Sequence, residues 1–269
     1  MSRIAARFAG LKAEGRAGFV TFITAGDPDM ARFEAVLAGL PAAGADLIEI
    51  GMPFSDPMAD GPAVQAAGLR ALKAGTKLSQ ILDAVARFRA HDQTTPIVLM
   101  GYYNPIFRFG GERFAKAAAS AGVDGLIIVD LPPEESDEFK PFTDAAGLDF
   151  IRLTTPTTDA HRLETVLRGA SGFLYHVAIA GITGTRSADA ADVAAMVAGI
   201  RQQTDLPIAV GFGVRTAAQA AEIARFADAA VVGTAIVETV AAHRDSAGLA
   251  EAVHAQVRGL AAGVRAARR

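Results

Sequence analysis

Short apolar runs alternate with longer alanine-rich stretches along the whole chain. The runs are rich in Val, Ile, Leu and Phe and lie at residues 18–24, 46–51, 96–101, 125–130, 149–153, 172–177, 207–213 and 229–234. Nearly every position within a run is apolar, which is typical of strands that are buried on both faces in a parallel sheet. The pattern therefore predicts eight parallel strands joined by crossover connections.

The stretches between the runs have the spacing of amphipathic helices. Apolar residues recur every three or four positions, as in Val193, Met196 and Ile200, and the stretches end near a glycine or a proline. Eight strand–helix units in about 250 residues are typical of an α/β fold of the (β/α)8 TIM barrel type, in which active sites lie at the C-terminal ends of the strands. A doubly wound open sheet is the alternative that the pattern leaves open.

The organisation of the chain is simple. No linker and no change of composition divides it, so we expect one TIM-barrel domain over residues 1–269, with an extra helix before the first strand. The N-terminal segment places Arg3, Arg7 and Lys12 among its apolar residues, so it lacks the apolar core of a signal peptide. No later run approaches the ~18 residues of a membrane span. We expect a cytoplasmic protein.

The composition favours small-molecule chemistry. The chain is 51% hydrophobic and 20% charged, with a net charge of −3 and no basic stripe, which argues against nucleic acid or an anionic membrane as a partner. It contains no cysteine, which excludes disulfides, thiolate metal sites and a cysteine nucleophile, and which fits a reducing compartment.

An acidic residue interrupts the second apolar run. Glu49 stands between Ile48 and Ile50, and this segment offers no nearby cation. An ionised carboxylate in a dry strand costs several kcal/mol unless it is paired, and burial raises its pKa toward neutrality. Such a group can both take and give protons, so Glu49 is a candidate general acid–base. The other explanation is an interior acid that is satisfied by a distant arginine or by water.

Two further acids follow in the next loop. Asp56 and Asp60 lie among Pro53, Pro57 and Pro62, in a segment without a positive charge. Aspartate is common in such loops because its side chain stabilises turns. Spacing alone does not decide which of the two would be the second carboxylate of a site.

Glycine-rich segments follow the last three runs. They are the segments 181–184, 211–213 and 233–235. Glycines let backbone N–H groups approach an anion, and the loops after strands seven and eight of such barrels often bind phosphate. Aromatic and apolar residues at strand ends would form a pocket for a flat apolar ring, namely Phe22, Met100, Tyr102, Tyr175 and Phe212.

Residues that other mechanisms need are missing from the strand ends. The lysines at 12, 73, 77, 116 and 140 fall in helical or loop patterns, which argues against a Schiff-base aldolase. Of the five histidines, only His176 lies in a strand run, so we expect no metal site. A single histidine in a strand is usually a core residue, and His176 receives no role.

These motifs resemble those of the tryptophan synthase alpha subunit family. The similarity runs through FVTFITAGDP (19–28), IEIGMPFSDPMADGP (48–62), DLPPEES (130–136), GITGT (181–185), VGFGV (210–214) and VVGTAIV (231–237). The resemblance implies a (β/α)8-barrel lyase that cleaves indole-3-glycerol phosphate to indole and D-glyceraldehyde 3-phosphate by a retro-aldol reaction, in the last step of L-tryptophan biosynthesis. It implies no cofactor in this chain and a beta subunit partner, in an alpha2beta2 complex, that uses pyridoxal phosphate.

The resemblance also implies roles for particular residues. Glu49 would protonate the indole C3 and remove the proton of the glycerol hydroxyl, and Asp60 would act at the indole N–H. The substrate pocket would comprise Phe22, Met100, Tyr102, Tyr175, Thr183 and Phe212, the phosphate site Gly184, Gly213, Gly233 and Thr234, and the partner interface Pro53, Asp56, Pro57 and Met58.

Four positions depart from the family pattern, among them Thr234 in place of a serine and Phe173 in place of a tyrosine, and three alternatives remain open. Ala178 and Ala180 stand where a serine and a polar residue are expected, which would affect closure of the loop after the sixth run. The alternatives are a stand-alone lyase that releases free indole, a different phosphate-binding barrel such as an epimerase or isomerase, and a non-catalytic activator of the beta subunit.

Overall fold

The strands form a nearly closed parallel barrel. The computed structural model describes residues 2–178, 190–211 and 213–268. Within these residues the strands follow the order β5-β4-β3-β2-β1-β9-β8-β7-β6, and each pair of hydrogen-bonded neighbours is parallel. They are β1 (Gly18–Thr24), β2 (Leu47–Gly51), β3 (Ile97–Gly101), β4 (Gly125–Ile128), β5 (Asp149–Phe150), β6 (Arg152–Thr154), β7 (Leu174–Val177), β8 (Ile208–Gly211) and β9 (Ala229–Val232). The predicted TIM barrel is confirmed, and the open sheet is excluded.

The fifth predicted strand is divided into two short strands. β5 pairs with β4, β6 pairs with β7, and Ile151 lies between them with its N–H 2.9 Å from the Leu126 carbonyl oxygen. The two ends of the sheet therefore meet within one apolar run. The other predicted runs agree with the observed strands to within two residues at each end.

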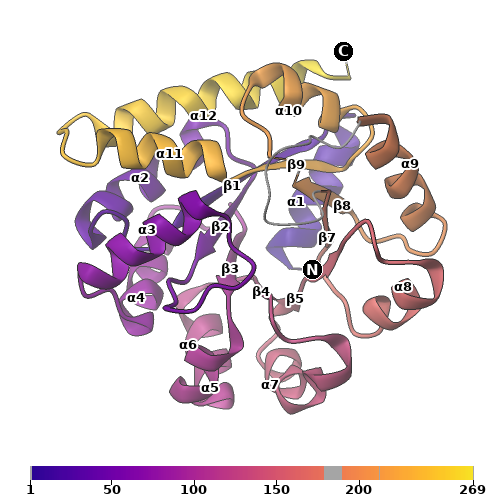
Figure 1. Cartoon of the computed structure of the whole chain (residues 1–269), viewed down its shortest axis with the longest axis horizontal. Helices are drawn as coiled ribbons and strands as arrows, with labels where there is room; N and C mark the ends of the chain where they lie inside the picture. Colours follow the sequence, from indigo (N-terminus) through magenta and orange to yellow (C-terminus); the bar gives the residue numbers. More distant parts are fainter. Residues whose placement is uncertain (1, 179–189, 212, 269) are drawn as a thin grey trace.

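A ring of helices surrounds the strands, as Figure 1 shows. The helices are α2 (Met30–Ala43), α3 (Pro62–Lys73), α4 (Leu78–Arg89), α5 (Tyr103–Phe109), α6 (Gly111–Ala121), η1 (Pro133–Glu138), α7 (Lys140–Ala145), α8 (Ala160–Leu167), α9 (Ala190–Arg201), α10 (Ala217–Ala224), α11 (Thr234–His243) and α12 (Leu249–Ala266). Among these described helices, none combines the length and the hydropathy that crossing a membrane would need.

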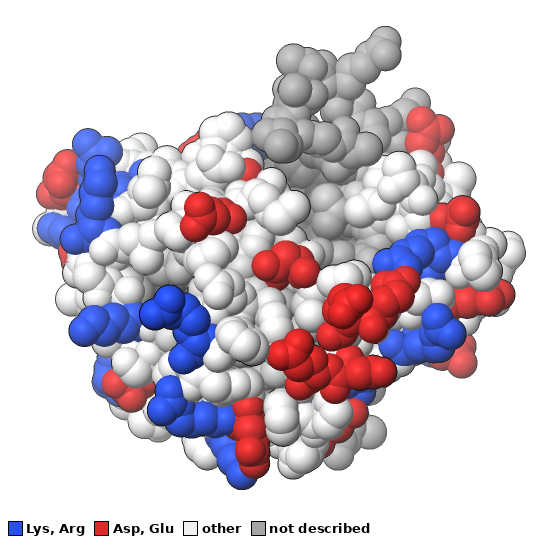
Figure 2. All heavy atoms as spheres, turned by 60° about the horizontal axis from the view of Figure 1, so that its bottom comes forward, with Lys and Arg blue, Asp and Glu red and all other residues white. Residues whose placement is uncertain are grey.

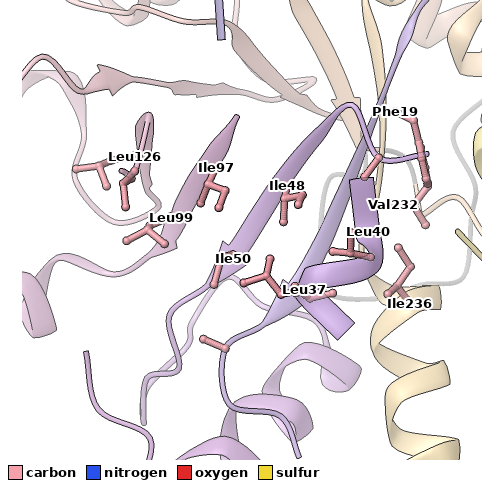
Figure 3. Packing of buried hydrophobic residues seen from close by; sticks show 14 of the residues in the cluster. Phe19, Leu37, Leu40, Ile48, Ile50, Ile97, Leu99, Leu126, Val232 and Ile236 are labelled. Atoms are coloured by element: carbon pink, nitrogen blue, oxygen red, sulfur yellow. The ribbon is translucent and has the colours of Figure 1, made fainter. Parts of the chain in front are cut away.

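The outer face of the barrel is an apolar layer beneath the helices. Ile48 and Ile50 on β2 and Leu37 and Leu40 on α2 belong to one cluster, and each is at most 1% exposed (Figure 3). Side chains along a strand point alternately to its two faces, so the residues between these outward-facing ones point into the barrel. Because both faces are buried, the runs are continuous in sequence rather than alternating.

An extra helix, α1 (Arg3–Ala13), closes the N-terminal end of the barrel. Ser2 caps it, and its hydroxyl accepts a hydrogen bond from the Ala5 N–H at 3.2 Å. Ile4, Phe8 and Leu11 of α1 join one buried cluster with the interior residues Val20, Leu47, Val98, Ile127, Ile151, Phe173, Ala209, Ala229 and Val231. This confirms the predicted extra helix and leaves the opposite, C-terminal end of the barrel available for a site.

Charges on the visible surface are mixed. Figure 2 shows acidic side chains gathered from the centre toward the lower right of this face, and basic side chains along its left side and near its right edge. The described surface in this view carries side chains of both signs and no continuous basic stripe.

Candidate active site

A pocket opens at the C-terminal ends of β1, β2 and β3. Its volume is about 380 Å³ when the open solvent space at its mouth is included. Its lining consists of Phe22, Thr24, Gly51, Met52, Pro53, Phe54, Pro57, Asp60, Val64, Gln65, Gly68, Met100, Gly101, Tyr102 and Val129. The predicted residues Phe22, Asp60, Met100 and Tyr102 thus come together at the end of the barrel where such folds place their active sites.

Glu49 lies inside the barrel, just below this pocket. Its neighbours in register are Phe22 on β1 and Val98 on β3. Gly51, the next residue on the same face of β2, belongs to the pocket lining, whereas Glu49 does not. The carboxyl group is therefore one step of the strand deeper than the floor of the pocket.

The surroundings of Glu49 favour its protonated form. The residue is 0% exposed, and neither carboxyl oxygen has a hydrogen-bond partner in the part of the chain that the structure describes. Burial raises the pKa of Glu49 to about 8. Within the described part of the chain no arginine pairs with this interior acid, so the structure does not support that alternative. A carboxyl group with this pKa can give a proton at neutral pH and take it back.

Glycines make room for aromatic rings next to Glu49. A Cβ atom at Gly51 would lie 2.5 Å from Cζ of Phe22, and one at Gly211 would lie 2.5 Å from the hydroxyl oxygen of Tyr175. Tyr175 is outside the pocket lining but close to Glu49: burial, and then the charge of Glu49, raise the pKa of Tyr175 well above its ordinary value. Any side chain at these two glycines would displace the rings.

Asp60 is fixed in the wall of the pocket. The Tyr102 hydroxyl donates to its Oδ1 at 3.1 Å and accepts a hydrogen bond from the Ala59 N–H at 3.1 Å. Burial raises the pKa of Asp60, and the hydrogen bond from Tyr102 opposes that rise. The side-chain amide of Gln65 donates to the Asp60 carbonyl oxygen at 2.8 Å. Helix α3 begins two residues later, with Pro62 at a position where its fixed φ angle suits a helix start.

The structure separates the two acids that spacing left equivalent. Asp56 is exposed, accepts a hydrogen bond from the Ser55 hydroxyl and does not line the pocket. Asp60 is half-buried and does line it. Asp60 is therefore the better candidate for the second carboxylate.

The loop after β2 faces both the pocket and the solvent. Pro53 and Pro57 belong to the pocket lining, while Met58 is 73% exposed. The four residues predicted as a partner interface thus lie on one loop that also forms a wall of the site.

Some of the predicted phosphate-binding residues lie at neighbouring strand ends. Gly213 follows β8 and has a φ angle of +63°, which favours glycine. Gly233 follows β9, the neighbour of β8, and Thr234 is the first residue of α11. A helix N-terminus beside glycines is a common phosphate site in TIM barrels. Three further predicted residues, Thr183, Gly184 and Phe212, lie outside the described residues, as does Ala180.

Several residues of the pocket were not predicted from the sequence. Thr24 and Val129 line it at the ends of β1 and β4, where the barrel prediction could have found them. Gln65 and Val64 line it from α3, and no strand-end pattern could have pointed to residues on a helix. The missed residues show that one helix forms part of the wall.

His176 and Ala178, which the sequence singled out, are both buried in the structure. His176 is buried, and its Nδ1 lies 3.0 Å from the Thr154 hydroxyl oxygen, on the strand face opposite to Tyr175. Ala178 is buried, and its N–H donates to the Gly211 carbonyl oxygen at 2.9 Å.

Over residues 2–178, 190–211 and 213–268, no three His, Asp or Glu side chains converge as a metal site would require.

Fold and site together define a class of protein. A (β/α)8 barrel with a buried, proton-holding carboxyl group under an aromatic pocket is an enzyme suited to acid–base chemistry on a small ring compound.

Comparison with known proteins gives the family. The family model described as tryptophan synthase alpha chain matches residues 8–265. The chain belongs to this family, whose members are lyases that cleave indole-3-glycerol phosphate in tryptophan biosynthesis.

Solved structures agree with this assignment. The chain is 37% identical to tryptophan synthase subunit alpha from Legionella pneumophila str. Paris, with 98% of each chain covered and a TM-score of 0.91. It is 35% identical to a chain of Mycobacterium tuberculosis tryptophan synthase in space group F222, with 98% of each chain covered and a TM-score of 0.90. A second M. tuberculosis structure, an open form with BRD0059 bound, is 33% identical, with 98% of this chain and 99% of that chain covered and a TM-score of 0.88.

Proposed function

We propose that Glu49 and Asp60 carry out the cleavage of indole-3-glycerol phosphate at the C-terminal end of this barrel. The observation that carries the proposal is the state of Glu49, which is fully buried, unpaired among the described residues and has a pKa raised to about 8. Its place directly beneath an aromatic pocket supports a role toward a ring substrate. The identity of that substrate, indole-3-glycerol phosphate, is taken from the reaction of the family.

In the first step the indole ring changes its tautomer. The protonated Glu49 gives its proton to C3 of the ring, and the Asp60 carboxylate accepts the proton of the ring N–H. One proton arrives and one leaves, so the product is a neutral indolenine. Because its pKa is raised, Glu49 holds the proton that it donates in this step. Asp60 must be ionised to accept the ring proton.

In the second step the carbon–carbon bond breaks. Glu49, now a carboxylate, takes the proton of the hydroxyl on the carbon attached to the ring, and that carbon becomes an aldehyde. The electrons of the broken bond return to the ring, and the ring nitrogen recovers its proton from Asp60. Indole and glyceraldehyde 3-phosphate leave, and both carboxyl groups return to their initial states.

The proposed substrate pose follows from the positions of the residues. The ring would lie against Phe22, Met100 and Tyr102, with Tyr175, Thr183 and Phe212 as further proposed contacts. The phosphate would be held by Gly184, Gly213, Gly233 and Thr234, at the N-terminus of α11. Because Glu49 lies below the floor of the pocket, the proposed pose requires a rotation about its side-chain bonds that carries the carboxyl group toward the ring.

The proposed partner is a tryptophan synthase beta subunit, in a heterotetramer of two alpha and two beta subunits. The exposed loop with Pro53, Asp56, Pro57 and Met58 supports an interface beside the pocket. Indole would pass to the beta subunit, where pyridoxal phosphate supplies the chemistry that joins it to serine, and this chain would need no cofactor of its own. The absence of cysteine fits a cytoplasmic site of action.

The test is an assay of indole release from indole-3-glycerol phosphate by the purified chain, alone and with a matching beta subunit. We expect slow release alone and faster release with the partner. Equal rates would favour a stand-alone lyase. Stimulation of the beta subunit without any cleavage would favour a non-catalytic activator. Turnover of a pentose phosphate in place of indole-3-glycerol phosphate would favour an epimerase or isomerase.

A further inference from the structure

A buried ion pair connects two sides of the pocket. Asp27 lies in the loop after β1, and Arg70 lies on α3, which stands beside β1 and β2 in Figure 1. Arg70 donates from Nε to Oδ1 of Asp27 at 2.7 Å and from Nη2 to Oδ2 at 2.8 Å. The Asp27 side chain is 2% exposed and that of Arg70 is 22% exposed. Two parallel charge-assisted bonds of this kind fix orientation as well as distance.

We propose that the Asp27–Arg70 pair is a positioning element of the active site, which sets the place of α3, and with it Asp60, relative to Phe22 and Thr24. The inference rests on the proposed function of Asp60. Neither Asp27 nor Arg70 lines the pocket, so both act through the residues that they hold.

Helix α3 needs such an anchor because its inner face is small. The buried residues of α3 are Ala67, Gly68 and Ala71. Ala67 packs against Phe22 and Val237 in a small apolar cluster. Side chains of this size make few van der Waals contacts, so apolar packing does little to fix the helix along its axis. A bidentate ion pair supplies the directional contact that packing lacks.

The position of α3 matters because the helix carries part of the site. Val64, Gln65 and Gly68 line the pocket from α3. Gln65 also holds the Asp60 carbonyl oxygen at 2.8 Å, so the start of the helix and the loop before it form one unit. A shift of α3 would therefore move Asp60 and the pocket wall together. A displacement of about 1 Å at a catalytic group can cost on the order of 100-fold in rate.

The loop that contains Asp27 is held in place by close contacts with its neighbours. Gly26 has a φ angle of +74°, and a Cβ atom there would lie 2.0 Å from the hydroxyl oxygen of Thr76, which follows α3. The Asp27 N–H donates to the Thr24 carbonyl oxygen at 3.3 Å. The same loop thus contacts the end of α3 and the pocket residue Thr24.

The opposite end of the barrel provides a matched control. Arg16 donates to Asp46 from Nη1 at 2.8 Å and from Nη2 at 2.9 Å. The side chains are 18% and 5% exposed, close to the values for Arg70 and Asp27. Asp46 precedes β2 at its N-terminal end, and neither residue lines the pocket. Asp46 also accepts a hydrogen bond from the Phe19 N–H at 2.9 Å, which asparagine can keep through its amide oxygen, so the control removes a similar ion pair at the other end of the barrel.

The experiment compares Arg70→Gln and Asp27→Asn with Arg16→Gln and Asp46→Asn. Each full-length variant is assayed with the beta subunit for kcat and KM of indole-3-glycerol phosphate cleavage, well below its Tm, and its Tm is measured separately. We expect both pairs of variants to lower the Tm. Only Arg70→Gln and Asp27→Asn should lower kcat/KM, by about 10-fold to 100-fold, with part of the loss in kcat. The double variant should lose no more than either single variant, because the two residues act as a unit.

Other outcomes have distinct meanings. If Arg70→Gln and Asp27→Asn lower only the Tm and keep wild-type kcat and KM, the pair is structural and the inference is wrong. If the control variants lose as much kcat/KM as these two, the inference is also wrong. If the wild-type chain with its partner releases no indole, the proposed function itself fails. Should Arg70→Gln not fold, Arg70→Lys keeps the charge but not the bidentate geometry, and it should still lower kcat/KM.

Discussion

Replacing Glu49 with glutamine is expected to abolish indole release while leaving the chain folded and able to bind its substrate. Glutamine preserves the shape of the side chain but can neither donate a carboxyl proton nor accept one. General acid–base groups contribute about 10²-fold to 10⁴-fold each, and Glu49 acts in both steps, so the loss should reach at least the upper part of that range. The measurements are indole release and the Kd of indole-3-glycerol phosphate for the variant and the wild type.

The same variant has a clear structural control. Glu49 is already neutral in most molecules at pH 7 because its pKa is raised to about 8, so a neutral amide replaces a largely neutral acid. The carboxyl group already lacks a hydrogen-bond partner among the described residues, so an unpaired amide in its place adds little to the about 1–3 kcal/mol that burying an unpaired polar group costs, and the unfolding free energy should change little. Near-wild-type turnover by Glu49→Gln would show that another group moves the protons. Loss of substrate binding in a folded variant would show that Glu49 has a binding role instead.

Replacing Asp60 with asparagine is expected to lower the cleavage rate by about 10²-fold to 10⁴-fold. Asparagine can still accept the hydrogen bond from Tyr102 through its amide oxygen, so the local structure should be kept. It cannot accept the ring N–H proton in the first step. The measurement is kcat and KM for indole-3-glycerol phosphate, with kcat expected to fall much more than KM rises.

Asp56→Asn is the comparison that tests the choice between the two loop acids. Asp56 is exposed and outside the pocket, so its replacement should cost the isolated chain at least about tenfold less than Asp60→Asn. Equal losses in the two variants, or a larger loss for Asp56→Asn, would contradict the assignment of Asp60 as the proton acceptor.

Much of the fold could be predicted from the sequence because parallel strands have a strong pattern. Continuous apolar runs located the strands to within two residues, and the side-chain alternation of a strand then places Glu49 opposite to Ile48 and Ile50, inside the barrel. An acid among such residues is a clear signal because its burial is costly. The sequence alone therefore identifies Glu49 as a candidate acid–base.

Other parts of the site could not be predicted because they depend on contacts between distant segments. Asp27 and Arg70 are 43 residues apart, and no local pattern relates a loop aspartate to a helix arginine. Gln65 shapes the pocket from a helix whose orientation is set by packing. The division of the fifth strand at Ile151 arises where the barrel closes, which is a property of the whole sheet.

The mechanism depends on whether Glu49 holds a proton at neutral pH, and infrared spectroscopy can observe this directly. Difference spectra between the wild type and Glu49→Gln, recorded from about pH 4 to about pH 10, isolate the C=O stretch of the protonated Glu49 carboxyl group. We expect this band to persist through neutral pH and to disappear around pH 8, in line with the pKa that burial gives the residue. Disappearance of the band near pH 4.5, the ordinary value for glutamate, would show that Glu49 is ionised at neutral pH and is not the initial proton donor.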